Sequence, residues 1–279
     1  EVTVTVAPKE ITVTPDNASK VYGESDKEFT YTPSGLVGED TLSDITLSRA
    51  EGDNVGTYEI TAAQKKDANP NYSVKFNKGT FTINPKEITV TITPNGGTYE
   101  GNIISAAAVL NGLVGEDKPE IILTYAGKAN DGTEVNGTKT PVLAGTYTVT
   151  ASITDSNYNL KAEGTTAEFV VTKATPGLSV AAVSDKSYGE GAFKLGVSNK
   201  GDGLKSYVSS NEKVVTVDEK GTITIVGAGT ATLTVSLAES ANYTADRKAV
   251  TVTVAPKEIT VTADNQKKIA GEADQIGRA

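Results

Sequence analysis

The sequence predicts an all-β protein made of three small domains in tandem. Three observations predict this fold class: β-branched residues alternate with period two along most of the chain, turn-forming residues interrupt these runs about every 8–12 residues, and stretches of sequence recur. No segment carries the apolar stripe of a long amphipathic helix. The chain is therefore expected to bury its apolar side chains between sheets.

The alternation defines the expected strands. Valine and threonine alternate over residues 2–6 and 250–254, and the same pattern with isoleucine covers 11–14 and 88–93. Successive side chains of a strand point to opposite faces of a sheet, so valine and isoleucine should face a core while threonine faces water. Both kinds of residue are β-branched and suit a pleated sheet.

The repeats divide the chain into domains. Residues 2–14 recur without change as residues 250–262, a third copy of this junction covers 84–90, and a variant covers 173–176. The intervals of roughly 80–90 residues suit small β domains. We therefore expect an elongated rod of consecutive parts: the tail of a preceding module (1–6), a first module (7–84), a second module (85–173), a third module (174–254) and the truncated start of a further module (255–279). Without strands to cover its apolar face, this last part should fray.

Shorter landmarks recur inside the modules. The first two modules share them in the same order: Gly-Leu-Val-Gly-Glu-Asp over 35–40 and 112–117, Gly-Thr-Tyr over 56–58 and 145–147, and Asn-Tyr over 71–72 and 157–158. The third module keeps Tyr-Gly at 188–189 and Asn-Tyr at 242–243 but differs between them. The first two modules are therefore expected to share one fold.

These landmarks resemble families of bacterial surface domains. The first module, with Val-Tyr-Gly at 21–23, resembles the MBG repeat of YGX type, and the second, with Tyr-Glu-Gly at 99–101, is similar to the sister YDG type with Glu100 in place of Asp. Residues 207–218 and 220–235 are similar to the bacterial immunoglobulin-like group 2 domain. The resemblance implies all-β extracellular modules strung in tandem on large bacterial surface adhesins, and it implies no catalytic residues.

The fold of the first two modules stays open between two alternatives. The third module is expected to be an immunoglobulin-like sandwich, whereas the first two are either immunoglobulin-like or closer to a β-grasp with one short helix. Residues 102–110, Asn-Ile-Ile-Ser-Ala-Ala-Ala-Val-Leu, form either a short helix or a strand that follows the turn at Tyr99. A helix there, packed across a mixed sheet, would favour the β-grasp.

Composition excludes several classes of function. The 279 residues include no His, Cys, Met or Trp. Thiolate chemistry and disulfides are therefore absent, as is the commonest general base and metal ligand. The formal net charge of −9 repels phosphate backbones, so we expect no nucleic-acid partner. No signal peptide and no membrane-spanning run of about 20 apolar residues is evident, and the missing start Met indicates a segment of a longer protein.

The tyrosines are the main candidates for recognition. Eight of the eleven occupy repeated landmarks, namely Tyr22, Tyr58, Tyr72, Tyr99, Tyr147, Tyr158, Tyr188 and Tyr243. Recurrence in the modules favours a folding role, in which a ring fills a core or a hydroxyl pins a turn, over a set of rings that stack on glycans. Tyr31, Tyr125 and Tyr207 fall outside the pattern and are the better candidates for a binding surface.

The glycine-rich segments are read as tight turns. No nucleotide-binding fingerprint surrounds the glycines, so tight hairpins with positive φ at glycine are expected rather than a phosphate loop. These glycines are Gly35, Gly38, Gly112, Gly115, Gly227 and Gly229.

Two pairs of carboxylates in turns, Glu39/Asp40 and Glu116/Asp117, are candidates for hydrolysis of glycosidic bonds or for calcium binding. Asp16-Asn17 and Asp53-Asn54 are further candidates for calcium binding. No tryptophan platform and no known calcium-loop spacing accompanies them. We therefore expect neither catalytic residues nor a metal site.

The junctions carry lysine–glutamate pairs and prolines: Lys9–Glu10, Lys86–Glu87 and Lys257–Glu258 follow Pro8, Pro85 and Pro256. An isopeptide bond between Lys9 and Asn84 is one interpretation, but it needs a buried lysine and a protonated carboxyl in an apolar pocket. A solvated charge pair that protects a strand edge is favoured. The prolines should stiffen each joint.

The sequence therefore favours a structural function. We expect non-catalytic stalk or spacer modules of a secreted or wall-anchored bacterial cell-surface adhesin-like protein. The alternative is a glycan- or mucin-binding module, including one accessory to a carbohydrate-active enzyme. We expect a monomer with no cofactor and no membrane insertion, whose partners are neighbouring modules of the same chain and, under the alternative, a host glycan or mucin. The sequence assigns no ligand-binding residues.

Overall fold

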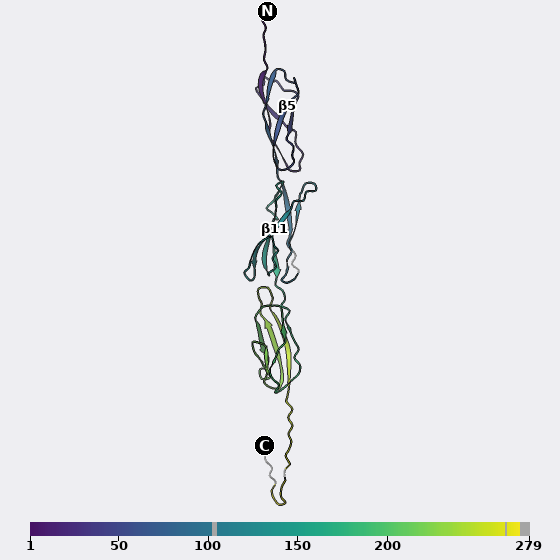
Figure 1. Ribbon diagram of the computed structural model, residues 1–279, viewed down its shortest axis with the longest axis vertical. Helices are drawn as coiled ribbons and strands as arrows, with labels where there is room; N and C mark the ends of the chain where they lie inside the picture. Colours follow the sequence, from purple (N-terminus) through teal and green to yellow (C-terminus); the bar gives the residue numbers. More distant parts are fainter. Residues whose placement is uncertain (102–104, 266, 274–279) are drawn as a thin grey trace. The chain divides into compact units, whose positions relative to one another are not determined.

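The computed structural model describes residues 1–101, 105–265 and 267–273 (Figure 1). The chain divides into two compact units, Glu1–Thr172 and Lys173–Ala279, so the first unit holds the first two modules and the second unit holds the third. The described residues form strands and turns without a helix, which confirms the all-β fold class. That part of the chain accordingly has no helix long and apolar enough to cross a membrane.

The first module forms two sheets from seven strands. They are β1 (Lys9–Pro15), β2 (Ala18–Val21), β3 (Tyr31–Ser34), β4 (Ile45–Arg49), β5 (Gly56–Gln64), β6 (Tyr72–Phe76) and β7 (Gly79–Asn84). One sheet has the order β3-β1-β6 and the other the order β2-β7-β5-β4. The chain passes from one sheet to the other at every connection except β4–β5. The pairs β1–β6 and β2–β7 are parallel.

The core of the first module lies between these sheets. Ile11 and Val13 of β1 are buried, as are Ile60 of β5 and Phe81 and Ile83 of β7, and β1 contacts both β5 and β7. Along each strand the buried positions alternate with more exposed ones. The expected period-two pattern therefore places one face of each strand in a β-sandwich core.

The second module repeats this arrangement with one strand more. Its strands are β8 (Lys86–Thr93), β9 (Gly97–Thr98), β10 (Ala107–Asn111), β11 (Ile121–Ala129), β12 (Glu134–Gly137), β13 (Gly145–Ile153), β14 (Tyr158–Leu160) and β15 (Thr166–Thr172). The sheets have the orders β10-β8-β14 and β12-β11-β13-β15-β9. Apart from β12, each strand has a counterpart in the first module, so the shared landmarks correspond to a shared topology.

The segment that left the fold open lies partly outside the described residues. Residues 102–104 are among those not described, whereas Ala107–Asn111 form β10 and pair antiparallel with β8. The strand alternative therefore holds for 107–110. Since the described residues of both modules contain two sheets and no helix, the immunoglobulin-like sandwich describes them better than the β-grasp.

The third module is a sandwich of short strands. They are β16 (Ser179–Val180), β17 (Lys186–Ser187), β18 (Phe193–Lys194), β19 (Val197–Ser198), β20 (Lys205–Ser209), β21 (Val215–Val217), β22 (Thr222–Ile225), β23 (Gly229–Leu237) and β24 (Asp246–Ala255). A four-stranded sheet, β17-β24-β23-β20, packs with the sheet β18-β22-β21 and the pair β16-β19. Val215, Ile223, Val235 and Val252 belong to one buried cluster that joins them.

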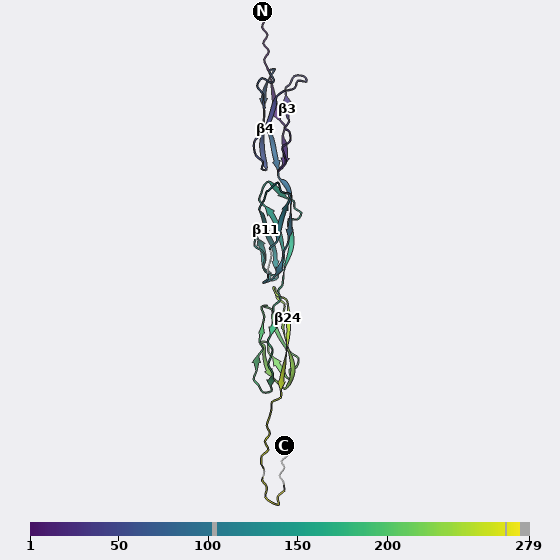
Figure 2. The ribbon, with the colours of Figure 1, turned by 90° about the vertical axis from the view of Figure 1, so that its right-hand side faces the viewer.

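The repeated thirteen residues adopt different structures in their two positions. Val4 in the first copy is 80% exposed, whereas the corresponding Val252 is fully buried in β24, where it pairs with β23. The second half shows the reverse: Ile11 is buried in β1, while its counterpart Ile259 is 80% exposed. Figure 2 shows β24 continuing into these residues, which carry no strand. The alternation is thus realised only where neighbouring strands cover it.

Candidate functional site: the joint between the first two modules

The first and second modules meet within the first unit through a very short connection. β7 ends at Asn84 and β8 begins at Lys86, with Pro85 between them. Proline fixes its own φ and keeps the residue before it extended, so the last strand of one module continues directly into the first strand of the next. Beside this crossing, the amide of Tyr22 donates a hydrogen bond to the Asn84 carbonyl (2.9 Å). Tyr22 is thereby placed at the face of the second module.

Tyr22 binds an aspartate–tyrosine pair of the second module. Its hydroxyl donates to Asp117 Oδ2 (2.9 Å), and the Tyr158 hydroxyl donates to the same oxygen (2.5 Å). The two rings meet edge to face, with centroids 5.3 Å apart and planes at 82°, the arrangement that aromatic pairs prefer. The Tyr158 hydroxyl also accepts a hydrogen bond from the Val114 amide (3.0 Å). We call Tyr22, Asp117 and Tyr158 the tyrosine latch.

The electrostatics of the latch favour neutral tyrosines around an ionised aspartate. Hydrogen bonds from Tyr158 and Tyr22 lower the pKa of Asp117. Burial, followed by the hydrogen bond to Asp117, raises the pKa of Tyr158 to about 12. The hydrogen bond to Asp117 likewise raises the pKa of Tyr22. The latch is therefore fully formed across the neutral pH range.

An asparagine makes a second polar contact across the joint. Asn157 Oδ1 accepts a hydrogen bond from the Val55 amide (2.8 Å), and its Nδ2 donates to Asn54 Oδ1 (3.1 Å). The backbone amide of Asn157 donates a hydrogen bond to Asp155 Oδ1 (2.9 Å), which orients this residue. The first module therefore meets two consecutive side chains of the second, Asn157 and Tyr158.

Close packing completes the joint. Gly23 has φ +83°, a region that favours glycine, and a Cβ added to it would lie 2.4 Å from Val114 Cγ2. Any larger residue at position 23 would therefore both strain the backbone and push the second module away. This explains the glycine that follows Tyr22.

The first module contains the same aspartate–tyrosine pair without the third member. The Tyr72 hydroxyl donates to Asp40 Oδ2 (2.5 Å) and accepts from the Val37 amide (3.1 Å). Val37 is 54% exposed, whereas its counterpart Val114 is partly buried against Gly23. We call Tyr72–Asp40 and Tyr158–Asp117 the acceptor pairs.

Sequence reasoning missed that two of its landmarks are partners. The aspartate that ends Gly-Leu-Val-Gly-Glu-Asp and the tyrosine of Asn-Tyr form each acceptor pair. The available signal was that both landmarks recur together in the first two modules. Asp40 and Asp117, which were candidates for catalysis or calcium binding, instead accept hydrogen bonds from tyrosine hydroxyls.

Two further carboxylate candidates, Asp16 and Asp53, are also engaged in hydrogen bonds or ion pairs. Asp16 accepts from the hydroxyls of Thr30 (2.6 Å) and Thr32 (2.8 Å), and these bonds lower its pKa. Asp53 lies 3.4 Å from Arg49. Within residues 1–101, 105–265 and 267–273, no three acidic side chains gather in a way that could hold a metal ion.

Two recurrent tyrosines pin turns with their hydroxyls, as the folding interpretation expects. The Tyr58 hydroxyl donates to the Asn54 carbonyl (2.7 Å), and that of Tyr147 to the Leu143 carbonyl (2.8 Å). Each bond spans four residues back along the chain, like a tyrosine corner. Positive φ at Gly35, Gly38, Gly112, Gly115 and Gly229 confirms most of the expected tight turns, whereas Gly227 does not adopt it.

The structure corrects the choice of surface tyrosines. Tyr125 is only 2% exposed and packs edge to face on Phe169 in the core of the second module, so it is not a surface candidate. Tyr207 is half-buried against the core of the third module, and Tyr31 is half-buried in β3. Tyr188, assigned to the recurrent folding set, is instead 49% exposed.

Lys9 and Asn84 lie at opposite ends of the first module. Lys9 begins β1 beside Tyr72. Gly79, at the start of β7, lies against Pro15 at the far end of β1, and β7 runs on from there to Asn84. Both Lys9 and Asn84 are exposed, so the fold does not bring the isopeptide candidates together.

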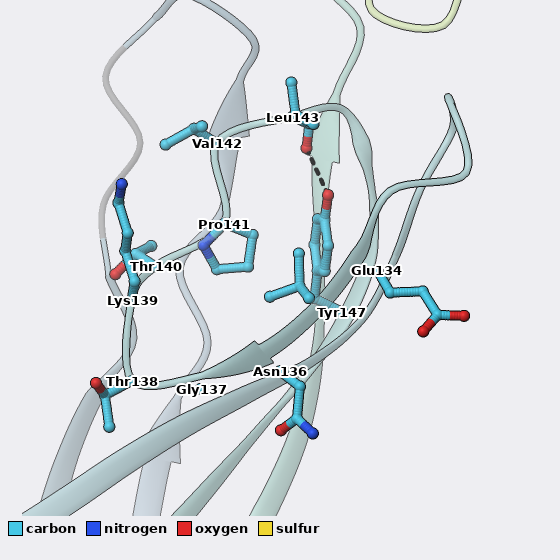
Figure 3. A pocket seen from close by; sticks show the side chains of 11 residues that line it. Glu134, Asn136, Gly137, Thr138, Lys139, Thr140, Pro141, Val142, Leu143 and Tyr147 are labelled. Atoms are coloured by element: carbon cyan, nitrogen blue, oxygen red, sulfur yellow. Dashed lines mark hydrogen bonds between the residues drawn. The ribbon is translucent and has the colours of Figure 1, made fainter.

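A cavity of about 350 Å³ opens on the second module after β12 (Figure 3). Pro141, Val142 and Leu143 form part of its wall, beside Tyr147. The ring of Tyr147 is 1% exposed and its hydroxyl is bonded to Leu143, so it offers no stacking face to a sugar. Glu134 is the acidic side chain among the lining residues, so the cavity has no carboxylate pair for glycoside hydrolysis.

Three models of known domain families match the chain, one in each of the three modules. Residues 11–82 match the MBG domain of YGX type, residues 88–175 match the MBG domain, and residues 188–239 match the immunoglobulin-like domain of intimin. The second match does not specify the YDG type. The third is to an intimin domain rather than to the group 2 domain, and it is bacterial immunoglobulin-like in either case.

Solved structures are similar only at a distance. The chain is 17% identical to the surface layer protein SbsC, domains 1–6, over 81% of this chain and 37% of that one, with a TM-score of 0.27. It is 8% identical to Drosophila N-cadherin EC1-3, over 87% of this chain and 98% of that one, with a TM-score of 0.24. It is 12% identical to a SusE-like surface located polysaccharide binding protein of Bacteroides thetaiotaomicron, over 77% of this chain and 35% of that one, with a TM-score of 0.24. The chain thus spans well under half of the S-layer protein.

A search of curated protein sequences gives no match. The family assignment therefore rests on the three domain matches, which follow one another along the chain in the order that the repeated landmarks predict. The chain is a tandem of two MBG domains, the first of them of YGX type, followed by a bacterial immunoglobulin-like domain.

Proposed function

We propose that these domains are non-catalytic spacer modules of a bacterial cell-surface adhesin-like protein, and that they hold a recognition domain away from the cell. The observation that carries this proposal is the joint between the first two modules. Its best-organised polar side chains, Tyr22, Asp117, Tyr158 and Asn157, bind one module to the next. A module whose recurrent groups fix its neighbour suits a stalk.

The domain families support the location. MBG and bacterial immunoglobulin-like domains are modules of surface proteins, and their tandem occurrence supports a role outside the cell. A chain without Cys and Met has no thiol or thioether to oxidise there. Its net charge of −9 favours solubility of an extended array.

Glycan binding is the second candidate, and one feature favours it. Tyr188, Val226 and Ile259 are exposed and, with Pro256, line a cavity of about 480 Å³ in the second unit. An exposed apolar patch that contains an aromatic ring is the kind of surface on which a sugar can stack. The Bacteroides protein named above binds polysaccharide, but its low similarity carries no argument for this chain.

A binding survey separates the two functions. The full chain is passed over immobilised mucin and a broad glycan panel, alongside Tyr188→Ala and, as a matched control at the other cavity, Val142→Ser. The spacer function predicts no saturable binding by any of the three proteins, each shown to be folded by cooperative melting. Saturable binding that Tyr188→Ala abolishes and Val142→Ser preserves would establish the glycan-binding function instead.

A further inference from the structure

We propose that the end of the third module around Tyr188 is a docking surface for a further MBG-type module, whose aspartate–tyrosine acceptor pair receives Tyr188. This inference deepens the spacer function, on which it rests, by naming the partner of the most exposed aromatic surface of the second unit. The partner is identified by its chemistry: a carboxylate and a tyrosine that together bind a phenol.

Tyr188 holds the backbone position in the third module that Tyr22 holds in the first. The Tyr188 amide donates to the carbonyl of Ala255 (2.9 Å), as the Tyr22 amide does to that of Asn84 (2.9 Å). β17, which precedes Tyr188, pairs in parallel with β24, as β2 pairs with β7. In both modules the accepting residue is followed by Pro-Lys-Glu-Ile-Thr-Val. Tyr22 and Tyr188 therefore occupy equivalent positions, each at the end of the corresponding sheet of its module.

The surroundings of the two tyrosines also correspond. In the first module the turn before β5 supplies Val55 to the joint. In the third, residues 226–228 before β23 line the cavity beside Tyr188. Gly23 and Gly189, which follow the two tyrosines, both have positive φ, +83° and +95°. The third module thus presents the same combination of ring, turn and glycine that the first module uses.

Exposure distinguishes the two ends. Tyr22 is half-buried, with its ring on Tyr158 and its hydroxyl on Asp117. Tyr188 is 49% exposed, and Val226 beside it is 45% exposed. Apolar surface of this kind is stabilised when a partner covers it.

The partner's half of the contact is visible in the first module. Its acceptor pair, Tyr72–Asp40, is already formed by the module itself, and Val37 beside it is 54% exposed. An MBG-type module therefore offers a preorganised carboxylate and an exposed valine, the counterparts of Asp117 and Val114 at the observed joint. Residues 255–274 repeat the opening of the first module, which indicates the YGX type as the occupant.

The repeat permits a direct test. A chain of residues 1–262 followed by a second copy of residues 15–84 places a first-module copy after the third module through a junction whose sequence is unchanged. Because the chain has no Cys, spin labels attach only at two introduced cysteines, Glu212→Cys in the third module and Thr46→Cys in the appended copy. Pulsed electron paramagnetic resonance then measures the distribution of distances between them.

We expect a narrow distribution that broadens in Tyr188→Ala and in Asp40→Asn of the appended copy. Tyr188→Phe, which keeps the ring, should broaden it less. Tyr22→Ala in the original first module, not in the appended copy, is the matched control and should leave the distribution of distances unchanged. A broad distribution in the parent, or a narrow one that Tyr188→Ala does not change, would overturn the proposal.

Two further readouts guard the interpretation. Tyr188→Ala in the 279-residue chain should leave the melting temperature of the third module unchanged, and a clear loss would show that Tyr188 is a folding residue. The two proposals fail in different experiments. The distance distribution of the extended chain tests the docking surface, whereas glycan binding by the 279-residue chain tests the spacer function. Loss of such binding in Tyr188→Ala would assign the surface to a glycan instead.

Discussion

At the scale of single residues, Tyr158 makes three contacts of the latch. Its hydroxyl donates to Asp117 and accepts from the Val114 amide, and its ring packs edge to face with the ring of Tyr22. Tyr72 makes the first two contacts in the first module, with Asp40 and Val37. The pair Tyr158 and Tyr72 therefore separates the effect of the joint from that of the fold.

We expect Tyr158→Phe to destabilise the second module by about 1 kcal/mol, because it deletes one hydrogen bond and leaves the Val114 amide without its acceptor. Tyr72→Phe should destabilise the first module without loosening the joint. Hydrogen exchange of the Val55 amide, which bonds to Asn157 of the second module, reports on the joint. Equal acceleration of this amide in both variants would contradict the role given to Tyr158.

We expect a partly buried ion-pair cluster to make the stability of the first module depend on acid pH. The Lys20 side chain is 7% exposed, and its Nζ lies 2.8 Å from Asp26 Oδ1. Arg49 Nε lies 2.5 Å from Asp26 Oδ2, and its guanidinium stacks on Phe81, 4.9 Å from the ring centroid. Hydrogen bonds from Arg49 and then Lys20 lower the pKa of Asp26. Both cations pack against the ring of Phe81, and Asp26 is the less exposed of the two carboxylates that they face.

The sign of the pH dependence follows from that lowered pKa. The folded first module binds its proton at Asp26 less readily than the unfolded chain, so the stabilisation is complete above the ordinary Asp pKa of about 3.9 and is lost as pH falls through the folded value. Asp26→Asn should lower the free energy of unfolding at neutral pH, and its difference from the parent should shrink below about pH 4. Hydrogen exchange of the β5 amides measures this.

Asp53 provides the matched control for Asp26. It faces the same two cations, at 3.8 Å from Lys20 and 3.4 Å from Arg49, but its side chain is 88% exposed. Exposed ion pairs contribute little to stability. Asp53→Asn should therefore leave the exchange rates nearly unchanged, and an effect as large as that of Asp26→Asn would contradict the assignment.

At the scale of elements, close backbone approach fixes how β20 enters the sheet of the third module. A Cβ on Gly203 would lie 1.9 Å from the carbonyl oxygen of Ala238, whereas one on Gly191 would meet nothing within 4 Å. We expect Gly203→Ala to destabilise the third module by about 1–3 kcal/mol, because the strand must shift. Gly191→Ala should be within about 0.5 kcal/mol of the parent. Urea unfolding followed by circular dichroism compares them, and equal stabilities would contradict the packing.

The repeated thirteen residues supply an internal control for context. Val252 pairs with β23, whereas Val4 lies in a segment without a strand. We expect the amides of residues 250–254 to exchange many times more slowly than those of 2–6, although the sequences are identical. Mass spectrometry after hydrogen exchange measures both segments in one sample. Similar protection would show that this sequence forms its strand by intrinsic preference.

These elements also show how far the sequence could be read. The alternation identified β1, β8 and β24 because one face of each is buried, and the repeats located the domains. Tyr125 was misplaced because it recurs nowhere, yet it lies on the inward face of β11. Tyr188 was expected to have a folding role, but it is 49% exposed, because recurrence alone does not show whether a ring is buried. Contacts across a joint, such as Tyr22 with Asp117, join residues that no local pattern connects.

At the scale of the molecule, the first module carries both halves of a joint. The first module presents Tyr22 at its end and an acceptor pair, Tyr72–Asp40, near its beginning. Under the proposed docking, such a module could be repeated without redesign, because each new copy would meet the last through the same contacts. The stability of an array of this kind is a sum over modules and joints.

The most direct measurement is the distance between the first two modules in solution. Spin labels at Thr46→Cys and Thr146→Cys, both at exposed positions, report it by pulsed electron paramagnetic resonance. The account predicts a narrow distribution in the parent chain that broadens in Tyr22→Ala and in Asp117→Asn, with both modules still folded. A broad distribution in the parent, or one that neither substitution changes, would contradict the claim that the tyrosine latch fixes the joint.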